Sequence, residues 1–171
     1  KACGVSKALI YHYYESKDAL LFDILHSHLT ELLESVEALS TPDDPKKGLH
    51  ALTQAILLAY RDADAEHKVQ INALGALPEE SQRELRAIQR RLVAIMSDRI
   101  EATAPELFAS RPELLKPVAM SAFGMLNWFY MWHRGGGDLS REAYAGLATD
   151  LILGGLDRIA EGKAEALETT L

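Results

Sequence analysis

The chain has 171 residues, 48% of them hydrophobic and 25% charged, which is typical of a globular protein with a sizeable core. No run of about 18 apolar residues occurs, which argues against a membrane-spanning helix. Cys3 is the only cysteine, which excludes a disulfide framework and a cysteine-based metal site and suits a reducing cytoplasm. The net charge of −7 argues against nonspecific coating of nucleic acid. Three lysines against one glutamate nevertheless give residues 1–17 a net charge of +2.

Apolar residues recur with the period of a helix along nearly the whole chain, and no hairpin dipeptide occurs, so an all-α protein is predicted. Ser16, Asp44 and Ser140 stand where an N-cap is expected, and Pro45 follows one of them. In chain order, helices are predicted over residues 7–13, 17–39, 45–61, 65–76, 78–101, 117–133 and 141–161.

The sequence also carries signals for breaks between these helices. Thr103–Glu106 and Ser110–Glu113 both have the form of a capping box. Pro117 is expected to kink or restart the helix that follows, and Gly135–Gly137 to terminate it. The helix over 45–61 becomes apolar nearly all round at Ile56-Leu57-Leu58-Ala59-Tyr60, which predicts that it lies in the middle of the domain.

The first informative segment is Cys3-Gly4-Val5-Ser6-Lys7-Ala8-Leu9-Ile10-Tyr11-His12-Tyr13-Tyr14-Glu15-Ser16-Lys17-Asp18-Ala19-Leu20. Gly4 permits a tight turn between two helices, and Ser6 can cap the second of them. An outward face of polar and aromatic residues would follow, made of Lys7, Ala8, Tyr11, His12 and Tyr13. This is the pattern of a helix-turn-helix that enters a major groove. On composition alone, packed core residues would be the favoured interpretation of the tyrosines.

This segment resembles the TetR-family pattern Ala-Gly-Val-Ser-x-Gly-x-Leu-Tyr-x-His/Tyr-Phe-x-Ser-Lys-Glu-x-Leu, with mild departures at Cys3, Ala8, Ile10 and Tyr14. The resemblance implies an all-α regulator with a helix-turn-helix head and a helical ligand-binding and dimerisation domain. It also implies that Tyr14 matches a core Phe. The DNA-binding residues that it implies are Ser6, Lys7, Ala8, Tyr11, His12, Tyr13 and Lys17.

By the same resemblance, residues 1–17 are the remnant of the head and residues 18–171 form the effector-binding domain, with 18–39 as a linking helix. The preceding helices of the head are expected upstream of Lys1. If the chain truly begins at Lys1, the head cannot bury its core, and this fragment is expected not to bind DNA.

The second informative segment, Phe123–Ser140, resembles the penultimate helix and following loop of TetR regulators that respond to acyl-coenzyme A thioesters. In that family the last two helices pair with those of a second subunit. The resemblance therefore implies a homodimer through 117–133 and 141–161, bound to a palindromic operator. An ordinary intramolecular core is the alternative.

A ligand pocket is predicted among the helices over 45–61, 65–76, 78–101 and 117–133, although each lining residue alone could be plain core. The candidate ligand-binding residues are Tyr60, Asn72, Met96, Asn127, Trp128, Tyr130, Met131 and Arg134. A coenzyme A ligand would also need cations for its phosphates, and His133, Arg134, Arg91 and Arg99 are possible. For Arg91 and Arg99, a solvated helix face is the favoured alternative.

No catalytic motif, cofactor motif or metal-ligand spacing occurs in the sequence. The sequence is therefore interpreted as a non-enzymatic transcriptional repressor, released from its operator by a small hydrophobic effector, with an acyl-CoA thioester as the best candidate. The alternatives are a TetR-type regulator of a drug or efflux response, a helical enzyme acting on thioesters, and a structural bundle that binds no small molecule.

Overall fold

The computed structural model describes residues 12–61, 74–133 and 139–162, and every regular element among them is helical. The elements, from Lys17 to Ala160, are α2 (Lys17–Glu37), α3 (Pro45–Ala59), the 3₁₀ turn η1 (Leu74–Ala76), α5 (Glu79–Thr103), α6 (Pro105–Ser110), the 3₁₀ turn η2 (Pro112–Leu114), α7 (Leu115–Trp132) and α8 (Arg141–Ala160). The predicted all-α class is confirmed. The helix predicted over 65–76 falls largely outside the described residues.

Three helices begin at the N-caps that the sequence predicts. The Ser16 hydroxyl accepts the Ala19 N–H at 3.0 Å at the start of α2. An Asp44 carboxylate oxygen accepts the Lys46 N–H at 2.9 Å before α3, whose first residue is a proline. Ser140 caps α8 in the same way. Each side chain satisfies an amide that has no partner within its own helix.

The two predicted capping boxes are wrong. Thr103 is still the last residue of α5, and its hydroxyl donates backward to the Ile100 carbonyl at 2.7 Å. Ser110 ends α6 and donates to the Leu107 carbonyl at 2.9 Å. Because each hydroxyl bonds to its own preceding turn, neither caps the helix that follows. Pro117 lies in the first turn of α7, where a missing N–H removes no helical hydrogen bond.

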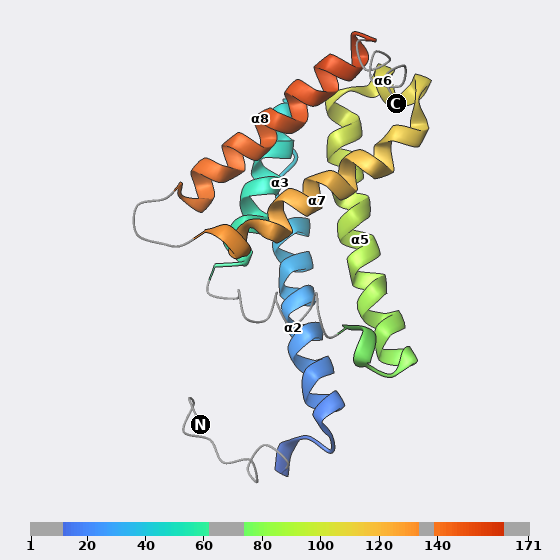
Figure 1. Cartoon of the computed structure of the whole chain (residues 1–171), viewed down its shortest axis with the longest axis vertical. Helices are drawn as coiled ribbons and strands as arrows, with labels where there is room; N and C mark the ends of the chain where they lie inside the picture. The colour runs from blue at the N-terminus through green and yellow to red at the C-terminus, as the bar shows by residue number, and fades with distance from the viewer. Residues whose placement is uncertain (1–11, 62–73, 134–138, 163–171) are drawn as a thin grey trace.

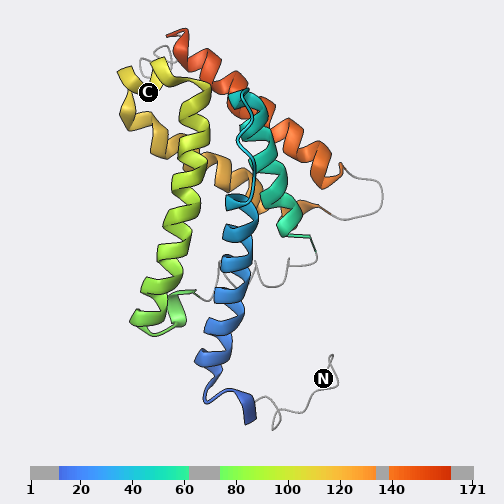
Figure 2. The same cartoon turned by 180° about the vertical axis from the view of Figure 1, so that it is seen from behind.

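The apolar helix α3 lies in the middle of the bundle, as predicted, and contacts α2, α5, α7 and α8. Figures 1 and 2 show the long helices α2 and α5 side by side, with α7 crossing them and α8 packed along α3. Leu49, Leu52, Ile56 and Leu57 of α3 have almost no exposed surface and form the centre of the core.

Helix α2 extends beyond this bundle toward the amino-terminal end (Figure 1). Its 21 residues span about 30 Å at the usual helical rise. From Leu25 onward the helix buries Leu25, Leu29, Leu32 and Val36 in the core, whereas its first turn is exposed or half-buried. Among the described helices, none is long and apolar enough to cross a membrane.

Candidate ligand-binding site

A cavity of about 450 Å³ opens between α2, α5 and α7. Two leucines of α2, Leu29 and Leu32, line one wall, and Tyr60, directly after α3, lies on the lining as well. The volume falls in the range of small-molecule sites, which is roughly 300–1,000 Å³.

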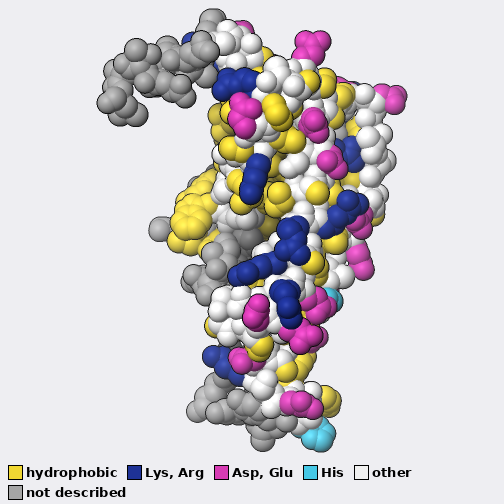
Figure 3. All heavy atoms as spheres, turned by 90° about the vertical axis from the view of Figure 1, so that its right-hand side faces the viewer, with side chains coloured by type: hydrophobic (Ala, Val, Ile, Leu, Met, Phe, Trp, Pro, Cys, Tyr) yellow, Lys and Arg dark blue, Asp and Glu magenta, His cyan; other side chains and the backbone are white. Residues whose placement is uncertain are grey.

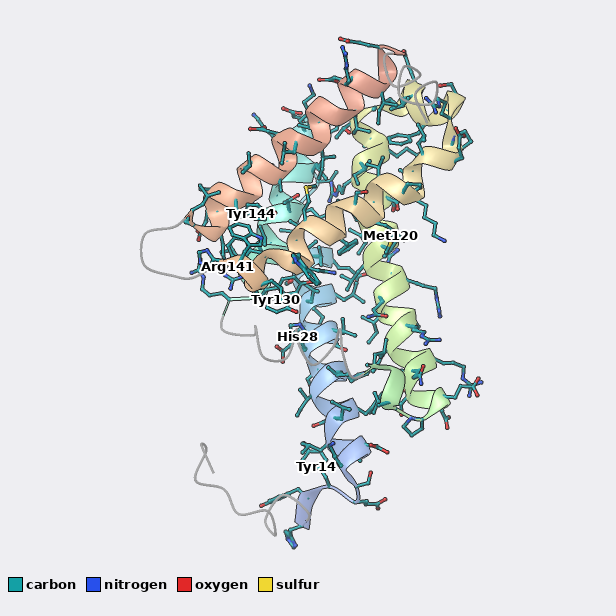
Figure 4. The ribbon with its side chains drawn as sticks, viewed as in Figure 1. Tyr14, His28, Met120, Tyr130, Arg141 and Tyr144 are labelled. Carbon is teal, nitrogen blue, oxygen red and sulfur yellow. The ribbon has the colours of Figure 1, made fainter. Side chains whose placement is uncertain are left out.

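Two helical stripes face one another across this cavity. On α5 the lining side chains are Arg86, Gln89, Arg90, Leu92 and Val93, and on α7 they are Lys116, Met120, Phe123 and Asn127. Most are spaced three or four residues apart, which places them on one face of their helix. Figure 4 shows Met120 where α7 crosses α5.

A partly buried hydrogen bond between the end of α3 and α7 lies on the cavity wall. The Tyr60 hydroxyl donates to the Asn127 side-chain carbonyl at 3.0 Å. Tyr60 is only 4% exposed, and burial raises the pKa of its hydroxyl well above its ordinary value. The group therefore stays protonated and remains a donor at any physiological pH. The ring of His28 on α2 lies 6.0 Å from the Tyr60 ring.

A second cavity, of about 590 Å³, lies on another side of α5, against the end of α2. Its lining contains both Glu37 and Asp98 beside Arg91 and Arg99. The Arg91 guanidinium pairs with Glu37 at 2.9 Å, and Arg99 donates to the Thr41 hydroxyl at 3.0 Å. The two arginines considered for phosphate binding are thus engaged here, away from the first cavity.

The sequence-predicted ligand residues fall into three groups. Tyr60 and Asn127 meet on the first cavity. Met96 is fully buried in the core and lines neither cavity, and Trp128 and Met131 are 55% and 52% exposed on the outside of α7. The remaining three are Tyr130, which is half-buried, and Asn72 and Arg134, which lie outside the described residues.

Sequence reasoning missed the three cations of the first cavity, Arg86, Arg90 and Lys116. Arginines on an exposed helix face are usually solvated, so the residue types of Arg86 and Arg90 give no signal by themselves. Their spacing relative to apolar residues on the same helix could have identified them. Arg86 and Arg90 are four residues apart and share a face with Val93, and Lys116 shares one with Met120.

Several of the predicted DNA-binding residues are exposed at the start of α2 and just before it. Tyr13 is 74% exposed, His12 is exposed, and Lys17 is the exposed first residue of α2. Tyr14, labelled in Figure 4, is half-buried and donates to Asp23 at 2.6 Å, a bond that raises the pKa of its hydroxyl. Ser6, Lys7, Ala8 and Tyr11 lie outside the described residues.

An aromatic cluster fixes the corner where α7 ends and α8 begins. The Phe129 ring stacks on His133 at 4.4 Å and lies 4.9 Å from the Tyr144 ring. The Arg141 guanidinium lies 5.0 Å above the same ring, and Trp132 meets it edge-on. These contacts hold the first turn of α8 against the end of α7.

Beyond this corner, both helices carry large apolar side chains on their outer faces. Trp128, Met131 and Trp132 of α7 are each 45% or more exposed, and so are Leu147 and Leu151 of α8. Several large exposed apolar side chains on neighbouring helices are a feature of interaction surfaces.

The chain matches two families of known proteins. Residues 42–156 match the family described as "Tetracyclin repressor-like, C-terminal domain", and residues 1–24 match "Bacterial regulatory proteins, tetR family". The first match runs from just before α3 to near the end of α8, and the second ends within α2.

Solved structures give the same result. A TetR-family transcriptional regulator from Bordetella parapertussis 12822 is 35% identical, with a TM-score of 0.81 over 89% of this chain and 79% of that one. The TetR-family regulator PfmR from Thermus thermophilus is 23% identical, with a TM-score of 0.74 over 89% and 83%. AibR, solved with isovaleryl coenzyme A and operator DNA, is 23% identical, with a TM-score of 0.71 over 88% and 82%.

The family match covers most of the bundle, and the Bordetella regulator exceeds the identity at which a common family is secure. This chain therefore belongs to the TetR family of bacterial transcriptional regulators.

Proposed function

We propose that this TetR-family protein is a repressor released from operator DNA when a hydrophobic effector fills the cavity between α2, α5 and α7. The observation that carries the proposal is that α2 takes part in both ends of the mechanism. Leu29 and Leu32 line the cavity, and Lys17 begins the same helix beside the DNA-binding head.

The length of α2 makes this coupling effective. Fifteen residues separate Lys17 from Leu32, which is about 22 Å along a helix. A tilt of about 5° at the cavity would displace the far end of a rigid α2 by about 2 Å. In a dimer both heads would move, so their spacing would no longer fit the two half-sites of an operator.

The dimer that this mechanism needs would form through α7 and α8. Their exposed faces carry Trp128 and Met131 on one helix and Leu147 and Leu151 on the other. Gly154 and Gly155 have open space around the position of a Cβ, which leaves room for a second helix to approach closely. A second copy, related by a twofold axis, would cover the same surface on both subunits.

An acyl-CoA thioester is the effector class that we favour. The resemblance of Phe123–Ser140 to thioester-responsive regulators supports it, and AibR provides an example of the same fold with isovaleryl coenzyme A and operator DNA. The cavity wall is apolar on its α2 side, which suits an acyl chain. Tyr60 and Asn127 add a hydroxyl and an amide to the lining.

A thermal-melt panel tests the effector class. The chain is heated with acyl-CoA thioesters of several lengths, with free coenzyme A, with free fatty acids and with apolar cationic dyes. A ligand at about 100 times its Kd stabilises the folded state by about 2.7 kcal/mol, or a rise of roughly 5–10 °C in Tm.

A rise with thioesters, but not with free coenzyme A, is the expected result. A rise with cationic dyes alone would reject the thioester and favour the second candidate, a regulator of a drug or efflux response. That candidate rests on the aromatic rings of Tyr60 and Phe123 in the cavity lining. Hydrolysis of a thioester during the assay would argue for the enzyme alternative.

A further inference from the structure

We infer that the mouth of the first cavity is an anion-binding subsite, formed by Arg86, Arg90 and Lys116, and that the effector is an amphiphile with its negatively charged group held there. The inference rests on the proposed function, because it concerns the chemistry of the same cavity. It goes further by assigning the charge of the ligand, its orientation and three residues that hold it.

The charged side chains that line this cavity are all positive. The lining contains three cations and no Asp or Glu. Within the part of the chain that the structure describes, no carboxylate forms an ion pair with any of the three. Arg86 donates from Nη2 to the Gln82 side chain at 2.8 Å, which orients it without neutralising it.

The second cavity provides an internal comparison. It is lined by two arginines and two carboxylates, and Arg91 is already paired with Glu37. An anion there would have to displace an existing partner. At the first cavity an anion would instead relieve the mutual repulsion of three cations, and an arginine can donate two parallel hydrogen bonds to a phosphate or carboxylate.

Lys and Arg side chains are numerous on the α5 side of the molecule (Figure 3). The figure views the side of the molecule on which α5 lies, and Lys and Arg side chains gather across the middle of that face beside apolar side chains. Arg86 and Arg90 are exposed residues of α5, and Lys116 is an exposed residue in the first turn of α7. All three are therefore accessible to a ligand from solvent.

The stripe on α7 gives the ligand a direction. It starts at the charged Lys116, continues through Met120 and the buried Phe123, and ends at Asn127, where Tyr60 is bonded. Eleven residues of helix span about 16 Å. An amphiphile of that length would have its anionic group at Lys116 and its apolar part against Phe123 and the leucines of α2.

The test uses two dyes that differ by one charge. 1-Anilinonaphthalene-8-sulfonate carries a sulfonate, and N-phenyl-1-naphthylamine has the same apolar rings without it. Both are titrated by fluorescence into the parent chain, into the variants Arg86→Gln, Arg90→Gln and Lys116→Gln, and into the triple variant. Arg83→Gln is the matched control, because Arg83 is an exposed cation of α5 that does not line the cavity.

The sulfonate dye is expected to bind the parent and to lose about tenfold or more in affinity in the triple variant. The neutral dye should bind both proteins equally, and Arg83→Gln should leave both affinities unchanged. The Tm of the unliganded triple variant should not fall, because the cations repel one another when no anion is bound.

Three results would overturn the inference: no binding of the sulfonate dye by the parent, an equal loss for both dyes, or a lowered Tm of the unliganded variants. A lowered Tm would mean that the cations serve the fold.

A second arm separates this inference from the proposed effector class. Octanoyl-CoA, octanoyl-pantetheine and octanoate are titrated against the same proteins by calorimetry. If octanoyl-CoA binds and the triple variant loses that affinity, both proposals stand, and the response to octanoate tells whether a carboxylate suffices. If octanoyl-CoA binds the variants as tightly as the parent, the anion subsite is wrong and the thioester class survives. If octanoyl-CoA does not bind the parent and the affinity of the sulfonate dye depends on the three cations, the subsite stands and the thioester class is rejected.

Discussion

The hydrogen bond between Tyr60 and Asn127 is expected to contribute about 1 kcal/mol to stability, and a double-mutant cycle measures it. Tyr60, the donor, is 4% exposed, and its hydroxyl lies 3.0 Å from the Asn127 oxygen. Water therefore has little access to the Tyr60 hydroxyl and cannot easily take the place of Asn127. Asn127 is half-buried beside the cavity, where water can reach it in part. Tyr60→Phe should therefore cost about 1 kcal/mol, and Asn127→Ala, which removes the acceptor of a buried hydroxyl, about 1–3 kcal/mol.

The assay is urea unfolding of the parent, the two single variants and the double variant. A coupling free energy of about 0.5–1.5 kcal/mol is expected between the two sites. Tyr14→Phe combined with Asn127→Ala is the control pair, because Tyr14 bonds to Asp23 at the far end of α2 (Figure 4) and should add independently. A coupling below about 0.3 kcal/mol for the Tyr60 pair would refute the contribution assigned to this bond.

Three further results are expected. Because burial raises the pKa of Tyr60 above its ordinary value of 10.0, the unfolded chain releases this proton first. The free energy of unfolding should therefore fall by up to about 1.4 kcal/mol per pH unit above pH 10, and it should fall less steeply in Tyr60→Phe. Equal slopes for the parent and Tyr60→Phe, measured by urea unfolding at about pH 9–11, would contradict this. Ser16→Ala should cost about 1 kcal/mol through loss of the α2 cap, whereas the same change at the exposed Ser27 should not destabilise, as urea midpoints would show. The double variant Leu147→Glu, Leu151→Glu should be a monomer by light scattering if the parent is a dimer, and its helicity by circular dichroism should not fall. An unchanged dimer mass would place the interface elsewhere.

Helix positions could be predicted because their signals are local. Ser16, Asp44 and Ser140 each act on amides two or three residues ahead, so a short stretch of sequence contains the whole interaction. Thr103 and Ser110 show the limit of this reasoning. Their hydroxyls had two possible partners, and the preceding carbonyl competed successfully with the following amide.

The cavity was harder to predict because it depends on which faces of distant helices meet. Tyr60 and Asn127 were predicted as polar groups in an apolar context, and they meet on the cavity wall although 67 positions separate them. Trp128 was chosen for its type alone, whereas its position on α7 directs it outward. The cations of the first cavity were passed over because exposed arginines are usually solvated. Only the crossing of α5 and α7 gives Arg90 and Lys116 a common site.

Coupling between the cavity and DNA is the central claim, and operator binding tests it most directly. Full-length protein is titrated onto a labelled duplex, selected from a random library for binding, with and without saturating octanoyl-CoA, and fluorescence anisotropy gives the two Kd values. We expect the occupied protein to bind the duplex about 5- to 150-fold more weakly. An unchanged Kd, under conditions where calorimetry shows the cavity filled, would contradict the proposed release of the repressor.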